Sequence, residues 1–305
     1  MNVPHVTPRP PGELVSLAAT GDLIASAVAD GAAVLAFNVV TLEHAEGIAE
    51  GAERAGVPAM FQISENTVHF HGGRLAPLVS ACAAIAARSS APLAIHLDHF
   101  TDATLIGEAL DAAADLGVTS IMVDAAHLPY DDNVDLTRTF ADRGRRAGLW
   151  VEAELGEVGG KGGAHDFGVR TDPAEAAAFT AATGVDGLAV AVGSSHAMTT
   201  RDAALDVDLI GRLAAAVPAP LVLHGSSGVP DDQLRLAVAA GIRKVNVGTA
   251  LNVAYTAALR EHLAAAPTKS DPRRALTAAR TAIADTVTDL CDVVAPRPVS
   301  NGGAR

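Results

Sequence analysis

The sequence alternates short apolar runs with longer segments of helical periodicity, and this alternation constrains the fold more than any other feature. The runs are rich in Val, Ile and Leu and lack apolar–polar alternation, as is typical of strands buried on both faces of a parallel sheet. The eight runs that we interpret as strands are residues 34–39, 58–63, 93–97, 120–124, 149–154, 187–192, 221–224 and 244–247. Eight strand–helix units predict a closed (β/α)8 TIM barrel. A doubly wound open sheet is the competing fold, but no early strand runs into a Gly-x-Gly-x-x-Gly turn.

The length and the helix signals favour one barrel-sized unit. The chain has 305 residues, of which 49% are hydrophobic and only 3% aromatic, so its core has to be built mainly from Ala, Val, Leu and Ile. A helix is expected from Pro230 to Gly241, and two more follow the last strand at 249–265 and 271–294. We therefore predict a single domain over residues 1–305, with an N-terminal arm at 1–12, additional C-terminal helices including one at 271–294, and a tail at 295–305.

The charge balance and the cysteine content exclude several classes of protein. With 22 Lys and Arg against 35 Asp and Glu, the formal net charge is -13, and no basic run could neutralise a series of phosphates. Nucleic-acid binding is therefore not expected. The two cysteines, Cys82 and Cys291, lie in apolar helical patterns that are typical of small buried side chains. No leader-like or membrane-spanning segment is evident, so the sequence predicts a soluble cytoplasmic protein.

Histidines stand at the carboxyl ends of three predicted strands, on the face where TIM barrels carry their chemistry. His99, His196 and His224 come from different parts of the sequence and could meet near the barrel axis. Any one of them alone could be a buried structural histidine. Three neutral imidazoles with one open coordination position are, however, what a catalytic Zn²⁺ needs. Their joint placement at strand ends therefore predicts a metal site.

Three carboxylates accompany these histidines at the strand ends. Asp98 is adjacent to His99 and could orient a metal ligand or transfer a proton. Asp124 and Glu154 could ligate a metal at a second or alternative position, occupied by a divalent or a monovalent cation. Hydrogen bonding of these two carboxylates to neighbouring loops is the other interpretation.

Small and hydroxylated residues follow the last two predicted strands. In a TIM barrel, the loops after strands seven and eight commonly bind phosphate, because small residues expose backbone N–H groups and a helix N-terminus attracts anions. Together with polar residues at other strand ends, they make up the expected substrate and phosphate site. The residues assigned to it are Asn38, Ser64, Gly193, Gly225, Ser226, Ser227, Asn246, Gly248 and Thr249.

A series of motifs between about Ala36 and Val294 resembles the class II, metal-dependent fructose-bisphosphate/tagatose-bisphosphate aldolases. The matching segments, in chain order, are Ala36-Phe37-Asn38, Gln62-x-Ser64, His96-Leu97-Asp98-His99, Met122-Val123-Asp124, Val151 to Gly156, Gly159-Gly160, Thr171-Asp172-Pro173, Gly184-Val185-Asp186, His196, Leu223-His224-Gly225, Ser227-Gly228, Lys244-x-Asn246 and Asp271-Pro272-Arg273. Several of these motifs are individually specific for the family.

The resemblance implies a role for each of the main site residues. The three histidines would hold the catalytic zinc, which would polarise the ketone of a sugar phosphate and stabilise the enediolate left when the C3–C4 bond breaks. Asp98 would exchange a proton with the C4 hydroxyl. Asn246 would help to hold the dihydroxyacetone part, and Gly225 and Ser227 would hold its phosphate.

The sequence departs from the family pattern in the loops around the site. The family's loop Glu, which moves the C3 proton, is replaced by Gly162. His165 could act as the acid or base instead, as could Asp166, although both could also be ordinary loop residues. The basic residue that the family uses for a distal phosphate corresponds to Asn252, and the family's preceding Asp or Ala corresponds to Gly248.

Three functions remain open from the sequence. The first is a zinc-dependent aldolase that reversibly cleaves a ketose phosphate, other than fructose 1,6-bisphosphate, to dihydroxyacetone phosphate and an aldehyde. The second is a pseudoenzyme that binds a metal and a sugar phosphate but lost catalysis with the loop Glu. The third is a hydrolase that uses the same metal to activate water. The resemblance also implies a homodimer or homotetramer.

Overall fold

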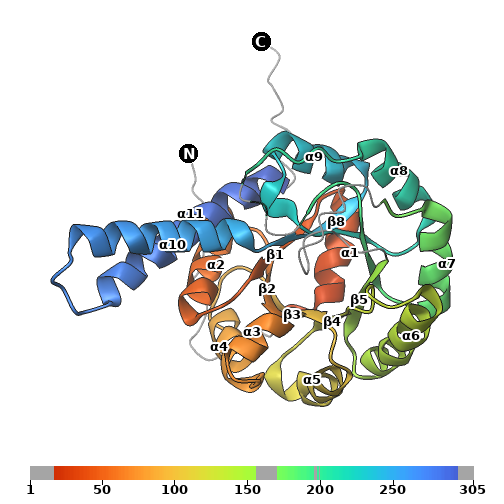
Figure 1. Ribbon diagram of the computed structural model, residues 1–305, viewed down its shortest axis with the longest axis horizontal. Coiled ribbons are helices and arrows are strands. Elements are labelled where there is room, and N and C mark those ends of the chain that lie inside the picture. Colours follow the sequence, from red (N-terminus) through yellow and green to blue (C-terminus); the bar gives the residue numbers. More distant parts are fainter. Residues whose placement is uncertain (1–16, 156–169, 196–197, 199, 295–305) are drawn as a thin grey trace, which may run out of the picture.

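Eight parallel strands close into a barrel in the computed structural model, which describes residues 17–155, 170–195, 198 and 200–294 (Figure 1). The strands are β1 Val34–Asn38, β2 Ala59–Ser64, β3 Leu93–Phe100, β4 Ser120–Val123, β5 Trp150–Leu155, β6 Gly187–Val190, β7 Leu221–Leu223 and β8 Ile242–Val247. Each pairs in parallel with the next in the chain, and β8 pairs with β1. The predicted (β/α)8 TIM barrel is confirmed, and the open sheet is excluded.

Helices alternate with the strands along the chain, and most of them surround the barrel on its outside (Figure 1). They are α1 Thr20–Asp30, α2 Leu42–Ala55, α3 Glu65–Phe70, α4 Ala76–Ala86, α5 Ala103–Leu116, α6 Tyr130–Arg146, α7 Pro173–Thr183, α8 Val207–Ala216, α9 Asp231–Ala240, α10 Thr249–Ala265 and α11 Arg273–Val294, with a short 3₁₀ helix at Ser226–Gly228. The helices expected at 230–241 and 249–265 are confirmed. The helix expected at 271–294 begins two residues later, at Arg273.

Helix α1 covers the N-terminal end of the barrel. Its apolar residues Leu23, Ile24 and Ala27 pack with inward-facing strand residues such as Met60 and Trp150. Thr20, at the start of α1, hydrogen-bonds to Ser120 of β4 over 2.8 Å. Because this end is closed by packed side chains, the carboxyl ends of the strands form the open mouth of the barrel.

Small residues allow the C-terminal helix to pack closely on the barrel. A Cβ atom at Gly47 of α2 would lie 2.8 Å from the Arg280 carbonyl oxygen, and one at Gly51 would lie 2.6 Å from Val287 of α11. Contacts this short leave no room for any side chain, so the two glycines set the distance between α2 and α11. This is the structural counterpart of a sequence rich in small residues and poor in aromatics.

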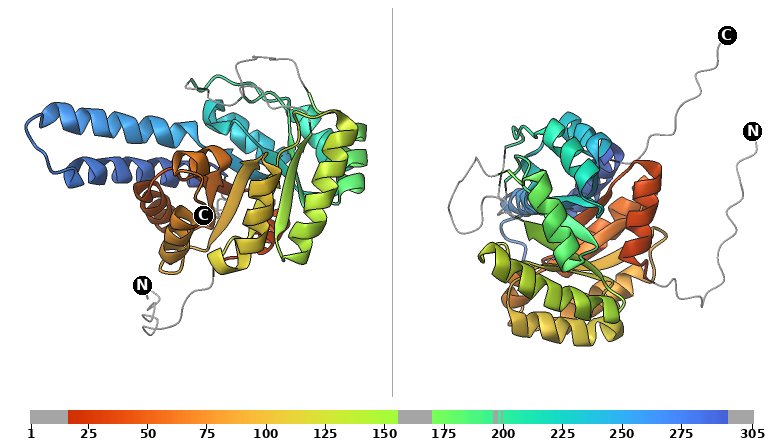
Figure 2. Two further views of the ribbon diagram at one scale, coloured as in Figure 1. Left: turned by 60° about the horizontal axis from the view of Figure 1, so that its bottom comes forward. Right: turned by 90° about the vertical axis from the view of Figure 1, so that its right-hand side faces the viewer.

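Helices α10 and α11 form an antiparallel hairpin that projects from the side of the barrel (Figure 2). Leu251 is the one buried residue of α10, and Val253 and Leu263 on the same helix are exposed. The N-terminus of α10 begins directly after β8. It is therefore this end of the hairpin that reaches the mouth of the barrel.

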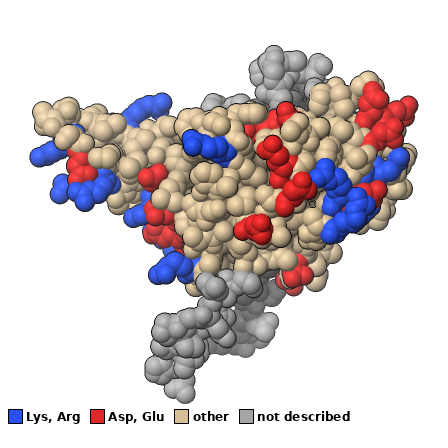
Figure 3. Space-filling model, turned by 90° about the horizontal axis from the view of Figure 1, so that it is seen from below, with Lys and Arg blue, Asp and Glu red and all other residues tan. Residues whose placement is uncertain are grey.

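The structure bears on some of the remaining sequence predictions, and others concern residues that it does not describe. Cys82 and Cys291 are buried and unpaired, as expected. The predicted arm at 1–12 and tail at 295–305 lie outside the described residues. Among the helices described, none is long and apolar enough to cross a membrane. On the face seen in Figure 3, basic side chains are interspersed with acidic ones rather than collected in one track.

Candidate active site

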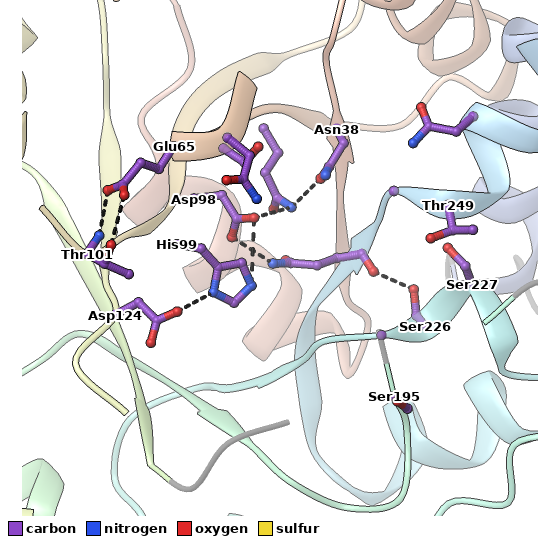
Figure 4. A pocket seen from close by; sticks show the side chains of 17 residues that line it. Asn38, Glu65, Asp98, His99, Thr101, Asp124, Ser195, Ser226, Ser227 and Thr249 are labelled. Carbon is purple, nitrogen blue, oxygen red and sulfur yellow. Dashed lines mark hydrogen bonds and ion pairs between the residues drawn. The ribbon is translucent and has the colours of Figure 1, made fainter. Parts of the chain in front are cut away.

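A cavity of about 510 Å³ opens at the carboxyl ends of the strands (Figure 4). Strands β1, β2, β3 and β8, together with the loops that follow β4, β6 and β7, contribute its wall. The described residues that line it are Asn38, Gln62, Ser64, Glu65, Asn66, Asp98, His99, Thr101, Asp124, Ser195, Gly225, Ser226, Ser227, Asn246, Gly248, Thr249 and Asn252. Apart from the two glycines, every residue of this lining has a polar side chain, which indicates a polar ligand.

A bulge near the end of β3 brings two neighbouring side chains into the cavity. Successive residues of a regular strand point to opposite faces, so Asp98 and His99 could not both face the barrel mouth. The register against β4 shifts between Leu97 and Phe100, where β3 contains one residue more than its partner. His99 occupies this point with a φ of 51°, an uncommon left-handed conformation for a residue other than glycine. Strain of this kind often accompanies a functional site.

Asp98, His99 and His224 form a cluster that could hold a metal ion. Each offers one ligand atom, and these atoms all lie within 4.8 Å of one another. The rings of His99 and His224 meet edge to face, with centroids 4.7 Å apart. His99 Nδ1 donates to Asp124 Oδ2 over 2.8 Å, which leaves the lone pair of Nε2 for a cation (Figure 4).

Carboxylates on both sides of His224 give the cluster a negative environment. His224 Nε2 lies 2.9 Å from Glu152 Oε1, and Nδ1 lies 3.1 Å from Glu154 Oε2. Burial acts to lower the pKa of His224, but these two carboxylates raise it to about 9. The imidazole is therefore cationic at neutral pH without a metal. A divalent cation could take over that positive charge, so the donor set fits a metal such as zinc.

Asp98 is held as a carboxylate by its neighbours. Burial acts to raise its pKa, but electrostatic interactions with the neighbouring His99, His224 and Lys244 side chains bring it below the ordinary value. Gln62 Nε2 donates to one oxygen over 3.1 Å, and Asn246 Nδ2 donates to the other over 3.2 Å. Both oxygens thus accept hydrogen bonds from amide N–H groups. These bonds form with the ionised carboxylate and do not require a proton on Asp98.

The buried side chain of Lys244 orients the amide of Asn246, which lines the cavity. This fully buried lysine of β8 donates to Asn246 Oδ1 over 2.7 Å and to Glu152 Oε2 over 2.8 Å. Burial and Lys244 together lower the pKa of His96 to about 3, so the neutral His96 ring can also accept from Lys244 over 3.4 Å. Sequence reasoning did not assign this role to Lys244. The available signal was a lysine two residues before Asn246, within a predicted buried strand.

The loops after β7 and β8 meet at the N-terminus of α10. Gly225 has a φ of 65°, and a Cβ there would lie 2.6 Å from the Ser195 backbone. A Cβ at Gly248 would lie 2.9 Å from the Asn38 amide nitrogen, so this glycine makes room for Asn38. Ser227 Oγ accepts from the Ala250 N–H over 3.1 Å. These loops therefore leave space at the N-terminus of α10, where the helix dipole favours an anion.

Most of the residues assigned to the site from sequence lie together. Asn38, Ser64, Asn246, Thr249 and the serines and glycines at 225–227 and 248 all line the cavity with Asp98, His99 and Asp124. His224 and Glu154 are buried beside them. Gly193 is not part of the described cavity lining, and a Cβ atom there would lie 2.6 Å from the Ala204 carbonyl oxygen. His165 and His196 lie outside the described residues.

Comparison with known proteins identifies the class to which this fold and site belong. The family model for fructose-bisphosphate aldolase class II matches residues 18–296. The chain therefore belongs to the class II fructose-bisphosphate aldolase family.

Solved structures of aldolases resemble this chain over most of its length. The YdjI aldolase from Escherichia coli K12 is 28% identical, with a TM-score of 0.79 over 94% of this chain and 98% of that chain. A candidate fructose-1,6-bisphosphate aldolase from Coccidioides immitis is 30% identical, with a TM-score of 0.81 over 90% and 95%. The fructose-bisphosphate aldolase of Campylobacter jejuni, 20% identical with a TM-score of 0.78 over 92% and 97%, shares the fold.

Proposed function

We propose that this protein is a zinc-dependent aldolase that reversibly cleaves a ketose phosphate to dihydroxyacetone phosphate and an aldehyde. The observation that carries the proposal is the cluster of Asp98, His99 and His224 in the cavity of a class II aldolase barrel. His99 and His224 would hold the metal, with His196 as the third ligand that the family resemblance supplies. The metal would polarise the substrate ketone and stabilise negative charge as the C3–C4 bond breaks.

Asp98 has the properties of the base for cleavage. It is ionised, and amide donors from Gln62 and Asn246 hold its two oxygens in place. In cleavage, it takes the proton of the C4 hydroxyl while the C3–C4 bond breaks and the aldehyde carbonyl forms. In condensation, it returns the same proton to the new C4 oxygen. Asn246, oriented by Lys244, would hold the dihydroxyacetone part.

The substrate phosphate fits the loops at the start of α10. Gly225, Ser226, Ser227 and Thr249 line the cavity where the N-terminus of α10 begins. A helix N-terminus stabilises an anion because its first N–H groups lack partners in the helix. Binding one phosphate here places the rest of the ketose beside Asp98 and His99.

Asp98→Ala tests this assignment. Its proton transfer is expected to contribute roughly 10²–10⁴-fold in rate, so the variant should keep zinc and lose most turnover. Zinc content by elemental analysis and aldol cleavage by release of dihydroxyacetone phosphate are measured on the same sample. Since Asp98 also lies within the metal cluster, loss of zinc from this variant would reassign it as a ligand, and turnover at the wild-type rate would exclude it as the base.

Exchange of the C3 proton of dihydroxyacetone phosphate with deuterated solvent tests the partial reaction without any aldehyde. The zinc-loaded protein should catalyse this exchange, and a protein that does not is the metal- and sugar-phosphate-binding pseudoenzyme instead. We propose His165 as the group that moves this proton, since Gly162 has no side chain to do so. Exchange should therefore fall in His165→Ala and persist in Asp166→Asn. Exchange that is unaffected in both variants would exclude both residues.

A further inference from the structure

One carboxylate from a neighbouring element holds the segment that follows β3. Glu65, the first residue of α3, accepts hydrogen bonds at Oε2 from the Thr101 N–H over 2.6 Å and from the Asp102 N–H over 3.0 Å. Its Oε1 accepts from the Thr101 hydroxyl over 2.8 Å (Figure 4). Hydrogen bonds to an ionised carboxylate are stronger than those between neutral groups. Glu65 therefore binds the two residues after Phe100 tightly.

Glu65 lies where the ladder between β2 and β3 ends. The last pair of that ladder is Ser64 with Asp98. Ser64 also begins α3, and its hydroxyl oxygen accepts from the Thr67 N–H over 3.2 Å. The chain of β2 thus turns into a helix at this point, while β3 continues to Phe100. The Glu65 side chain supplies hydrogen-bond acceptors on this side of the longer strand.

The peptide group between Phe100 and Thr101 is held at both ends. Its carbonyl oxygen, on Phe100, accepts from the Asp124 N–H over 2.9 Å on the side of β4. Its N–H, on Thr101, donates to Glu65 on the side of β2. This doubly bonded peptide group comes one residue after His99, at the point where the bulge of β3 closes.

The bulge needs such support because the backbone of His99 is strained. Its φ of 51° lies in the left-handed region, which is unfavourable for a residue with a side chain. Residues in such regions persist only where the surrounding structure holds them firmly. If β3 relaxed to a regular strand, Asp98 and His99 would point to opposite faces. The bulge therefore decides whether His99 reaches the metal cluster.

We propose that Glu65 is a positioning residue that maintains the bulge of β3 and thereby keeps His99 at the metal cluster. Its contribution differs from that of Asp124, whose Oδ2 lies 2.8 Å from Nδ1 of the His99 ring. Asp124 orients the ring, and Glu65 holds the backbone that carries it. The inference rests on the proposed function, which takes His99 as a metal ligand, and it makes metal affinity depend on Glu65.

Direct contact with the substrate is the alternative role for Glu65, because this residue lines the cavity. Both of its carboxylate oxygens, however, already accept hydrogen bonds from Thr101 and Asp102. Its side chain is also only 13% exposed. These two observations favour the positioning role.

Titration of the metal-free protein with Co²⁺ tests the positioning role without turnover. Glu65→Ala removes both acceptor oxygens, so the affinity for Co²⁺ should fall by roughly 10- to 100-fold, the usual effect of losing an outer partner of a metal ligand. The visible absorption of bound Co²⁺ should change as well, because it depends on the number and geometry of the ligands. Circular dichroism at the titration temperature verifies that the variant is folded.

Glu65→Gln provides a second variant in case Glu65→Ala does not fold. Glutamine retains one acceptor oxygen, so its Co²⁺ affinity should lie between those of the wild type and Glu65→Ala. Glu53→Ala is the matched control, because Glu53 Oε1 accepts from the Ser90 N–H over 2.9 Å just before the opposite end of β3. It removes a carboxylate-to-backbone bond of the same kind and should leave the affinity and the absorption at their wild-type values.

Three results would overturn the role of Glu65. The first is unchanged Co²⁺ affinity and absorption in both Glu65 variants. The second is equal weakening in Glu65→Ala and Glu53→Ala, which would indicate a general loss of stability. The third is a raised KM for the ketose phosphate with unchanged Co²⁺ binding, which would assign Glu65 to substrate contact.

The wild-type protein separates this inference from the proposed function. A wild type that binds neither Co²⁺ nor Zn²⁺ would overturn the metal site on which the proposed function depends. Tight binding by the wild type and equally tight binding by both Glu65 variants would overturn the role of Glu65 alone.

Discussion

At the scale of single residues, the stability of the barrel centre depends on buried charges that are paired with one another. Lys244 and Glu152 are both fully buried and lie 2.8 Å apart. Burial acts to raise the pKa of Glu152, but Lys244 and His224 bring it far below the ordinary value. Replacing one partner leaves the other charge buried without a counter-charge. This lowers the free energy of unfolding more than replacing both partners by apolar side chains.

We therefore expect Lys244→Met to lower the free energy of unfolding by about 3–5 kcal/mol, the usual cost of breaking a buried ion pair. Urea unfolding at pH 7 measures this change, with the exposed Lys269→Met as the control. Because the folded-state pKa of Glu152 is depressed, the stability that it contributes is present above its unfolded value of 4.5 and is lost as the pH falls below it. A variant as stable as wild type, with the same acid dependence, would contradict the role of the pair.

At the scale of elements, the sequence was sufficient to predict the strands but not the conformation at their ends. Each predicted run contains or overlaps an observed strand, because uninterrupted β-branched and aliphatic runs are a strong signal for buried parallel strands. The end of β3 differs because the strand continues through the bulge at His99 to Phe100. A bulge depends on pairing with β4, which is distant in sequence. For the same reason, the partnership of Lys244, Glu152 and Asn246 could not be derived from spacing alone.

The loop after β7 gives the element-scale prediction. Gly225→Ala combines a positive φ with a Cβ 2.6 Å from the Ser195 backbone, so it should cost about 1–2 kcal/mol or more and raise the KM for the phosphorylated substrate. Thermal unfolding and steady-state kinetics measure both effects.

Gly211→Ala, inside α8, is the matched control for Gly225→Ala, since nothing lies within 4 Å of its Cβ position. It should stabilise the protein by about 0.5–1 kcal/mol without a kinetic effect. Equal changes in stability and in KM in the two variants would show that the loop conformation at Gly225 does not affect substrate binding.

At the scale of the whole molecule, the division between scaffold and site is clear in the packing. The helices and strands bury an apolar core. The buried charged residues Lys244, Glu152 and Asp98 lie at the centre and the mouth of the barrel. The sequence predicted this division because polar residues recur at strand ends. The expected homodimer or homotetramer depends on surfaces that a single chain does not test, and it stays a prediction.

Metal removal tests how the site is coupled to the scaffold. Since the one candidate metal cluster found among the described residues lies at the mouth of the barrel, a chelator should abolish turnover while the far-ultraviolet circular dichroism stays unchanged. A ligand that binds only the folded state stabilises it by about 2.7 kcal/mol at 100 times its Kd, so the zinc-loaded protein should unfold a few degrees higher. Calorimetry with and without added zinc measures this shift.

Binding should also release a proton near neutral pH, because the pKa of His224 without metal is raised to about 9. Metal affinity should accordingly increase as the pH rises toward that value, since fewer protons then compete for the imidazole. Titration calorimetry in two buffers of different ionisation enthalpy counts the released protons. Full turnover after chelation would exclude His224 as a metal ligand. Zinc binding that neither releases a proton nor raises the unfolding temperature would exclude it as well. In either case, the carboxylates around His224 would form a purely structural cluster.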